Sequence, residues 1–316
     1  MRQRNTSAPA VADALPSPAV ALGIALVLIG MFLFSANDAL GKWLVTTYSV
    51  GQVLLIRSAA ALVALLPFIW LWGRPAIVSR DRPGIQALRV LFSTAEVFCF
   101  YSAVYFLPLA DVMTFWLAAP IYVAALSPML LGESVGWRRW TGIIVGFIGV
   151  IIVLNPSSAT LTLPALISVV GSLTFALMML TGRMLRRTPD TALVFWQTMG
   201  ALIAGAVLAP WGWVQPTDFD WMLLGCLGII AMGAHVLINR SLKLADAATI
   251  APFQYTLLPW AVIFGYFFFG DIPRWNMLIG AAVIVGAGLY IYFREQRVKK
   301  HRQVVTTRPP GDVPGA

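Results

Sequence analysis

Long apolar runs alternate with short polar segments along almost the whole chain. Each run holds about 20 residues, the length that an α-helix needs to cross the hydrocarbon core of a bilayer. The runs are continuously apolar and do not alternate, so we expect helices and not the strands of a membrane barrel. The pattern predicts ten membrane-spanning helices, at about residues 20–45, 50–72, 85–107, 109–131, 138–155, 162–184, 191–213, 219–240, 246–269 and 274–293.

The two halves of the chain carry the same pattern. Equivalent positions in the halves are Leu109-Ala110-Asp111 and Leu244-Ala245-Asp246, Pro120 and Pro259, Gly132-Glu133 and Gly270-Asp271, and Trp137 and Trp275. Because each half holds an odd number of helices, the halves must insert in opposite orientations. The sequence therefore predicts an all-α integral membrane protein built from two inverted five-helix repeats, residues 19–155 and 156–295.

Composition and charge agree with a membrane protein. Of the 316 residues 59% are hydrophobic and only 11% are charged, whereas soluble chains average about 25% charged residues. The net charge of +9 would suit a nucleic-acid partner, but most basic residues fall in alternate loops and in the C-terminal segment. That asymmetry follows the rule that cytoplasmic loops are basic, so we expect both termini in the cytoplasm and no nucleic-acid partner.

The ends of the chain and the cysteines add two expectations. Residues 1–18 are rich in Ala, Pro and Ser and residues 296–316 are basic, and both predict disordered cytoplasmic segments. The basic tail also invites binding to anionic membrane lipids. Cys99 and Cys226 both lie inside apolar runs, so no disulfide framework, metal spacing or other cofactor is expected.

Three segments carry a family resemblance. They are SANDALGKWL at Ser35–Leu44, the stretch of the first half that runs from LADV to GESVGWRRW (residues 109–140), and APFQYTLLPWAVIFGYFFFGDIP at Ala251–Pro273. With the repeated proline, Gly–acidic loop and glycine-rich helix, they resemble the ten-helix EamA branch of the drug/metabolite transporter superfamily. Asp271 departs from the family, which usually has Glu there. The nearest subgroup is bacterial and includes carriers of S-adenosylmethionine and of riboflavin.

The resemblance implies secondary transport of a small molecule across a bacterial inner membrane, without ATP. It also implies that the glycine-rich helices support the bundle and, in some members, a homodimer. No cluster of histidines, Ser/His/Asp set or acidic metal motif points to an enzyme.

Glu96 is the first candidate for the transport chemistry. It lies near the middle of a predicted helix, where an ionisable group costs about 2.5–3.5 kcal/mol to insert. The equivalent position in the second half is Ala231, so the shared scaffold does not require the carboxylate. We expect Glu96 to couple transport to protons or to bind an ammonium group, with a structural partnership to a nearby donor as the alternative.

The first predicted helix carries a second candidate group. Asp38 and Lys42 stand four residues apart, so they share a helix face and can form an ion pair. Asn37 is adjacent, and the second half has Met178 and Met179 at the positions of Asn37 and Asp38. The group predicts either a polar wall of a cavity or simple helix packing with one ion pair.

Two arginines lie within predicted spans. Arg57 has Gln197 as its counterpart in the second half. It is expected to pair with Asp38 or Glu96 in the scaffold, or to contact a carboxylate or phosphate of the substrate through bidentate hydrogen bonds. Arg89, near a helix end, is expected to extend to the lipid headgroups.

The remaining candidates are polar or aromatic residues on later helices. His235 and Asn239 stand four apart on one helix. Gln254 and Tyr255 precede Pro259, and Trp116 and Tyr122 flank Pro120. Prolines open the helix backbone to a cavity, and aromatic rings stack on planar or cationic ligands. Packing between helices is the alternative for each of them.

The leading hypothesis is a secondary carrier that moves a small organic metabolite by alternating access. Its substrate would be amino-acid-like, S-adenosylmethionine-like, riboflavin-like or a secondary metabolite, with uptake and export both open. Proton exchange would pass through Glu96 or Asp38, beside a cavity lined by helices one, two, three, four, eight and nine. The alternatives are a lipid scramblase or flippase and a membrane scaffold that transports nothing.

Overall fold

The computed structural model describes residues 18–72, 82–132, 137–154, 162–185, 187–244 and 251–307. The N-terminal arm up to residue 17, Glu133, residues 245–250 and the last nine residues lie outside this part. The helices are α1 (Pro18–Val45), α2 (Val50–Trp72), α3 (Pro83–Phe106), α4 (Leu109–Leu117), α5 (Ala119–Leu131), α6 (Trp137–Leu154), α7 (Leu163–Met184), α8 (Asp190–Leu208), α9 (Asp218–Leu244), the 3₁₀ helix η2 (Ala251–Thr256), α11 (Leu257–Phe269) and α12 (Trp275–Thr307).

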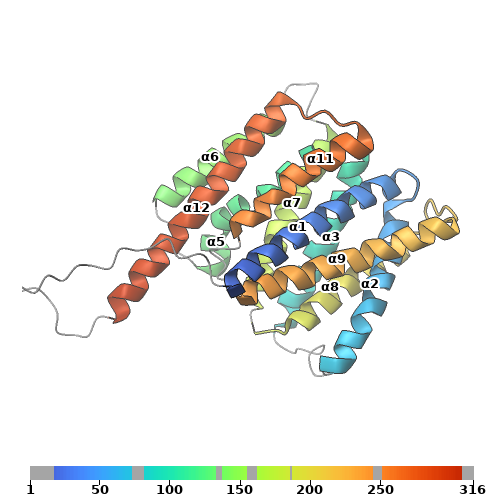
Figure 1. The fold of residues 1–316 in the computed structure, drawn as a ribbon, viewed down its shortest axis with the longest axis horizontal. Helices are drawn as coiled ribbons and strands as arrows, with labels where there is room; N and C mark the ends of the chain where they lie inside the picture. Colours follow the sequence, from blue (N-terminus) through green and yellow to red (C-terminus); the bar gives the residue numbers. More distant parts are fainter. Residues whose placement is uncertain are drawn as a thin grey trace, which may run out of the picture.

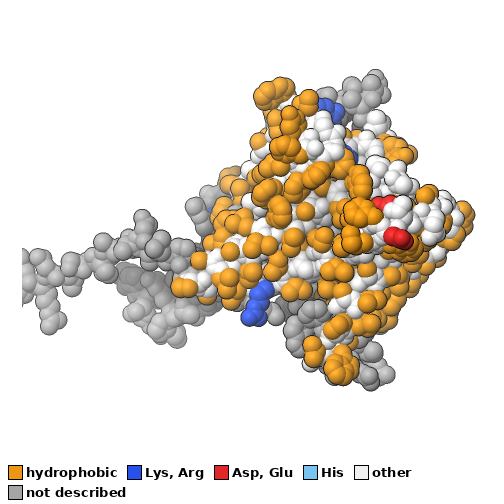
Figure 2. Space-filling model, turned by 45° about the vertical axis from the view of Figure 1, so that its right-hand side comes forward, with side chains coloured by type: hydrophobic (Ala, Val, Ile, Leu, Met, Phe, Trp, Pro, Cys, Tyr) orange, Lys and Arg blue, Asp and Glu red, His pale blue; other side chains and the backbone are white. Residues whose placement is uncertain are grey.

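These elements form ten spans, as the hydrophobic pattern predicts. Among the described residues, seven helical segments are long and apolar enough to cross a membrane, and three shorter apolar helices make up the other spans. No strand is assigned in the described ranges. The protein is therefore an all-α integral membrane protein, and the face drawn in Figure 2 is covered mainly by hydrophobic side chains.

Spans four and nine are each broken, although the hydrophobic pattern alone predicted continuous helices. The first break separates α4 from α5 at Ala118, and the second separates η2 from α11 at Thr256. Each break lies just before a proline, Pro120 and Pro259 respectively. Proline has no N–H to donate and its ring clashes with the preceding turn, which ends a regular helix. The two breaks occupy equivalent positions in the two repeats.

Helix packing repeats the internal symmetry of the sequence. The helix α1 packs along α9, while its repeat counterpart α7 packs along α3. The pairs α2 with α8 and α6 with α12 join equivalent helices of the two repeats, and Figure 1 shows α6 and α12 side by side at one edge of the bundle. The glycine-rich faces of this last pair meet closely: a Cβ on Gly149 would lie 3.1 Å from the carbonyl oxygen of Gly280.

The Gly–acidic loops begin with the same backbone turn. Gly132 ends α5 and Gly270 ends α11, each with φ of 67°. This left-handed conformation favours glycine and closes a helix through hydrogen bonds to its last carbonyls. At the second loop the N–H of Asp271 donates to the carbonyl of Gly265 at 3.0 Å. The turn fixes where Asp271 leaves the helix.

The C-terminal segment differs from the prediction. α12 continues to Thr307, through residues 296–307 that were expected to be disordered. The segment is rich in Arg, Gln, Lys and Glu and holds no proline before Pro309, so its residues have good helix propensity and extend the last span as a helix.

Close packing at Gly228 gives a prediction for stability. A Cβ added there would lie 2.0 Å from the carbonyl oxygen of Arg57, whereas one on Gly225, three residues away, would meet only Ala60 at 4.0 Å. We expect Gly228→Ala to destabilise the purified protein by about 1–3 kcal/mol, because α9 must move away from the α2 backbone. The thermal midpoint should fall by several degrees relative to Gly225→Ala. Equal midpoints would contradict this packing.

Candidate functional site

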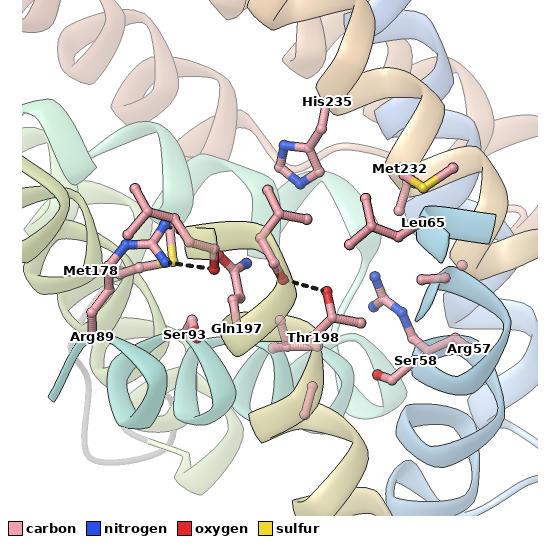
Figure 3. Close-up of a pocket in the computed structure, with 17 residues that line it drawn as sticks. Arg57, Ser58, Leu65, Arg89, Ser93, Met178, Gln197, Thr198, Met232 and His235 are labelled. Carbon is pink, nitrogen blue, oxygen red and sulfur yellow. Dashed lines mark hydrogen bonds between the residues drawn. The ribbon is translucent and has the colours of Figure 1, made fainter. Parts of the chain in front are cut away.

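A partly open cavity of about 240 Å³ lies between the two repeats. It is lined from α2 and α3 of the first repeat and from α7, α8 and α9 of the second (Figure 3). Its lining residues are Arg57, Ser58, Ala61, Leu65, Arg89, Ser93, Val97, Met178, Leu193, Val194, Gln197, Thr198, Ala201, Gly228, Ala231, Met232 and His235.

The polar lining comes from equivalent positions of the two repeats. Arg57 and Ser58 on α2 have Gln197 and Thr198 on α8 as their counterparts, and all four line the cavity. Equivalent positions of the two repeats therefore contribute to the same cavity. Inverted-repeat carriers bind their substrates at this kind of interface.

Two arginines are held at opposite sides of the cavity (Figure 3). Arg57 Nη1 donates to the Tyr101 hydroxyl at 2.6 Å. Arg89 Nη1 and Nη2 donate to the Leu193 carbonyl and to Gln197 Oε1, each at 3.3 Å. Arg89 thus joins α3 to α8 at the cavity wall, where the sequence predicted that it would extend to lipid headgroups.

His235 occupies a third side of the cavity, beside Met232 (Figure 3). Its ring meets the Phe34 ring edge-on, with centroids 4.8 Å apart. The histidine therefore has an aromatic support from α1 and a polar edge available to the cavity. The side chain of Asn239, its predicted partner, lies outside the described part of the structure.

Glu96 lies behind the cavity wall, in a central polar cluster that we define as Asn37, Asp38, Arg57, Glu96, Tyr101 and Trp116. Trp116 Nε1 donates to Glu96 Oε1 at 2.7 Å. The Trp116 ring reaches this position because α7 has glycine opposite it: a Cβ on Gly171 would lie 2.4 Å from the ring. The tryptophan is therefore a hydrogen-bond donor to the buried carboxylate, a more specific role than the predicted stacking.

Asp38 enters the same cluster from α1. A Cβ on Gly41 would lie 2.4 Å from the Tyr101 ring, so the glycine lets α1 approach the tyrosine closely. Asp38 lies in the electrostatic field of Arg57 and of Glu96, with Asn37 beside it. Arg57 therefore lines the cavity and also acts electrostatically on both carboxylates.

The sequence suggested that Lys42 could pair with Asp38, but Lys42 pairs with Asp271 instead. Its Nζ lies 2.7 Å from Asp271 Oδ2 and 4.5 Å from the centroid of the Phe269 ring. The four-residue spacing permits a local pair, but Lys42 is close to the end of α1 and its long stem reaches the loop between α11 and α12. The Lys42–Asp271 pair joins the first repeat to the second.

Other contacts between the repeats cluster at this end of the bundle, which we refer to as the Lys42 end. Arg274 donates to Asp111 beside the first ion pair. The Tyr48 hydroxyl donates to Asp220 Oδ2 at 2.6 Å. Gln52 exchanges two hydrogen bonds with the Val214 backbone, at 2.6 and 3.0 Å. The cavity lies in the opposite half, towards the ends of α2, α7 and α9, which we refer to as the Arg89 end.

The other predicted site residues lie away from the cavity. Tyr122 packs against Phe147 of α6, with ring centroids 5.4 Å apart. Tyr255 packs against α12, where a Cβ on Gly288 would lie 1.9 Å from its hydroxyl, and Gln254 is exposed. The contacts of Tyr122 and Tyr255 fit the packing alternative, whereas the exposed Gln254 fits neither a cavity nor packing between helices.

The lining differs from the prediction in its helices as well. Spans six and seven, which are α7 and α8, line the cavity, whereas spans one, four and nine do not. Arg89, Ser93 and Thr198 line the cavity but were not among the site residues that the sequence predicted. The repeat correspondence between Arg57-Ser58 and Gln197-Thr198 was the signal that could have found α8.

An integral membrane bundle of two five-helix repeats, with a polar cavity between them, is the architecture of a membrane carrier. Among the described residues no group of three or more His, Cys, Asp or Glu side chains is placed to hold a metal ion. The chain belongs to the EamA-like transporter family, whose model matches residues 21–155 and 162–293. It is therefore a metabolite transporter and not an enzyme.

Curated relatives agree with this family. The chain is 28% identical over 277 residues to an S-adenosylmethionine uptake transporter of Rickettsia bellii, covering 87% of this chain and 95% of the relative. It is 27% identical to a riboflavin transporter of Rhizobium johnstonii, covering 89% and 94%. A crystal structure of a protein with 14% identity matches with a TM-score of 0.57, over 89% of this chain and 98% of that chain, and supports the fold alone.

Proposed function

We propose that the protein is a secondary carrier that moves a small organic metabolite by alternating access, through the cavity between its repeats. The observation that carries the proposal is the contrast between the two ends of the bundle. Hydrogen bonds and ion pairs between the repeats close the Lys42 end, while the polar cavity lies in the other half. A carrier of this kind would transport by closing one end as the other opens.

The relatives and the cavity together indicate the size and kind of substrate. The two relatives are named as transporters of S-adenosylmethionine and of riboflavin. The cavity volume of about 240 Å³ is just below the range for small-molecule sites, about 300–1,000 Å³. This favours a metabolite, or part of one, the size of an amino acid or a single ring system. The combination of arginines, hydroxyls and methionines suits a substrate with both polar and apolar parts.

We propose that Glu96 couples transport to protons, with Asp38 as the second candidate. Both carboxylates lie in the central polar cluster. Arg57 belongs to this cluster, acts electrostatically on both carboxylates, and also lines the cavity. A substrate group that draws on Arg57 would change the balance of charge in the cluster. Proton exchange at the carboxylates would compensate for that change.

The proposed location is the inner membrane of a bacterium, with both termini in the cytoplasm. Basic residues gather in the loops at the Arg89 end and in the C-terminal segment. In this orientation the cavity of the structure is in the cytoplasmic half, and the closed Lys42 end faces outwards.

A lipid scramblase and a scaffold fit the geometry less well. A scramblase needs a polar groove that lipid headgroups can follow along the bundle, whereas the polar residues of this cavity face one another between the repeats (Figure 3). A scaffold has no need for carboxylates inside the bundle, where ionisable groups are costly.

The test is transport by the purified protein in proteoliposomes. Labelled S-adenosylmethionine, riboflavin and a panel of amino acids would be offered with and without a pH gradient. The proposal expects saturable movement of at least one of them, stimulated by the gradient. Leakage equal to that of protein-free liposomes for the whole panel would count against it.

A further inference from the structure

We propose that the cavity contains an oxyanion subsite, built on Arg57 with Arg89 across the cavity adding positive charge, that receives a carboxylate of the transported metabolite. The inference rests on the proposed function and specifies its substrate class. The cavity would select metabolites that carry an anionic group, and it would bind neutral or purely cationic analogues poorly.

The cavity lining is positively charged. Two guanidinium groups line the cavity, and none of its described lining residues is acidic. The carboxylates of Asp38 and Glu96 lie behind Arg57, where Glu96 is held by Trp116 at 2.7 Å. A low-dielectric cleft with one sign of charge on its walls concentrates ions of the opposite sign.

The N–H donors of Arg57 are oriented for binding an oxyanion. Arg57 has five N–H donors in a planar fork, and the Tyr101 hydroxyl accepts from Nη1 at 2.6 Å. This bond, with the Tyr101 ring 5.2 Å from Cζ, orients the guanidinium towards the cavity, as Figure 3 shows. Planar guanidinium groups bind carboxylates and phosphates through paired, charge-assisted hydrogen bonds.

Neutral donors complete the subsite around the arginines. Ser58 and Thr198 lie at equivalent positions of the repeats, and Ser93 lies one helical turn from Arg89 on α3. Gln197 accepts from Arg89 at 3.3 Å, which places its amide N–H groups at the same site. The Ser58 hydroxyl and the Gln197 amide can donate to an oxyanion next to the arginines, whereas the Ser93 and Thr198 hydroxyls donate to the carbonyls of Val90 and Val194 at 3.0 and 2.8 Å. The cavity volume selects a small oxyanion.

A thiol in the cavity tests the charge without any knowledge of the substrate. Thr198→Cys would be made in the full chain with Cys99 and Cys226 replaced by alanine. Its reaction rates would be compared for anionic sulfonatoethyl and cationic trimethylammonioethyl methanethiosulfonates. The rate of each reagent with the protein thiol is divided by the rate of the same reagent with free 2-mercaptoethanol. The ratio of the anionic to the cationic normalised rate is then independent of any change in the acidity of the protein thiol.

The subsite predicts a normalised preference for the anionic reagent of about tenfold or more. Arg57→Gln and Arg89→Gln should each reduce the preference several-fold, and Arg57→Lys should retain most of it. Equal rates, faster reaction with the cation, or no reaction with either reagent would overturn the proposal. Gel filtration of each variant checks that the fold is intact.

Protection of this thiol identifies the source of the anion. S-adenosylmethionine, with its carboxylate, should slow the reaction at least several-fold more than decarboxylated S-adenosylmethionine, or riboflavin 5′-phosphate more than riboflavin. If only nanodiscs of phosphatidylglycerol, and not those of phosphatidylcholine, slow the reaction, the site binds lipid phosphate and the substrate assignment is wrong. An anionic preference without uptake of any labelled metabolite would reject the proposed function and leave the oxyanion subsite standing.

Discussion

Glu96→Gln is expected to abolish the stimulation of transport by a pH gradient and to lower the transport rate by about tenfold or more, equivalent to about 1.4 kcal/mol. Glutamine has the shape of the carboxylic acid but cannot exchange a proton. It can still accept the hydrogen bond that Trp116 Nε1 gives to Oε1 at 2.7 Å, so the fold should tolerate the change. Uptake in proteoliposomes, measured across a series of imposed gradients, gives the result.

Trp116→Phe is the matched control for the Glu96 variant. It keeps the carboxylate and the aromatic ring but removes the N–H donor to Glu96. We expect reduced transport that still responds to the gradient, because the proton-exchanging group remains. If Glu96→Gln kept the normal rate and pH dependence, the coupling role of Glu96 would be wrong and Asp38 would be the next carboxylate to replace.

Asp271→Asn is expected to open the Lys42 end. The substitution leaves Lys42 without its charged partner. The pair is largely buried, since the Lys42 side chain is 10% exposed and the Asp271 side chain 22%. Removing one partner of a fully buried pair costs about 3–5 kcal/mol. Because this pair is partly hydrated, we expect about 1–3 kcal/mol, which shifts the balance of open and closed states by about fivefold to 150-fold.

Labelling of intact cells measures this shift. In the proposed orientation, a membrane-impermeant maleimide reaches Thr198→Cys only when the Lys42 end opens, so Asp271→Asn should increase labelling. The double exchange Lys42→Asp with Asp271→Lys should restore the low level. Arg187→Gln changes an exposed residue between α7 and α8, at the opposite end, and should leave labelling unchanged. Equal labelling of Asp271→Asn and its parent would show that this ion pair does not hold the end closed.

The spans and their duplication were predictable from the sequence because both are written in long patterns. A span needs about 20 apolar residues whatever its neighbours are, and the paired prolines 120 and 259 mark both helix breaks. The left-handed glycines 132 and 270 repeat at equivalent loops. These features depend on local chemistry and on comparison of one half with the other.

The site was less predictable because it depends on contacts between distant residues. Lys42 pairs with a residue 229 positions away, and a four-residue spacing on one helix could not exclude the local alternative. Arg89 was assigned to the headgroups from its place near a helix end. In the fold α8 packs closely against α3 near Arg89. A Cβ on Gly200 of α8 would lie only 2.3 Å from the Val90 side chain of α3, so the glycine permits this approach. Arg57 and His235 line the cavity. The sequence singled them out because buried polar groups in a membrane span need a reason, and their roles stay predictions.

Blocking the cavity tests the central claim, that substrate passes between the repeats. Ala201 lines the cavity on α8 and is 92% buried, with 8% of its surface exposed, so Ala201→Trp would fill the space beside Thr198. The measurement is gradient-driven uptake of the labelled metabolite by proteoliposomes that contain wild-type or Ala201→Trp protein at equal, monodisperse amounts. Transport through this cavity predicts that uptake falls to the level of protein-free liposomes in Ala201→Trp. Wild-type uptake by that variant would contradict the claim.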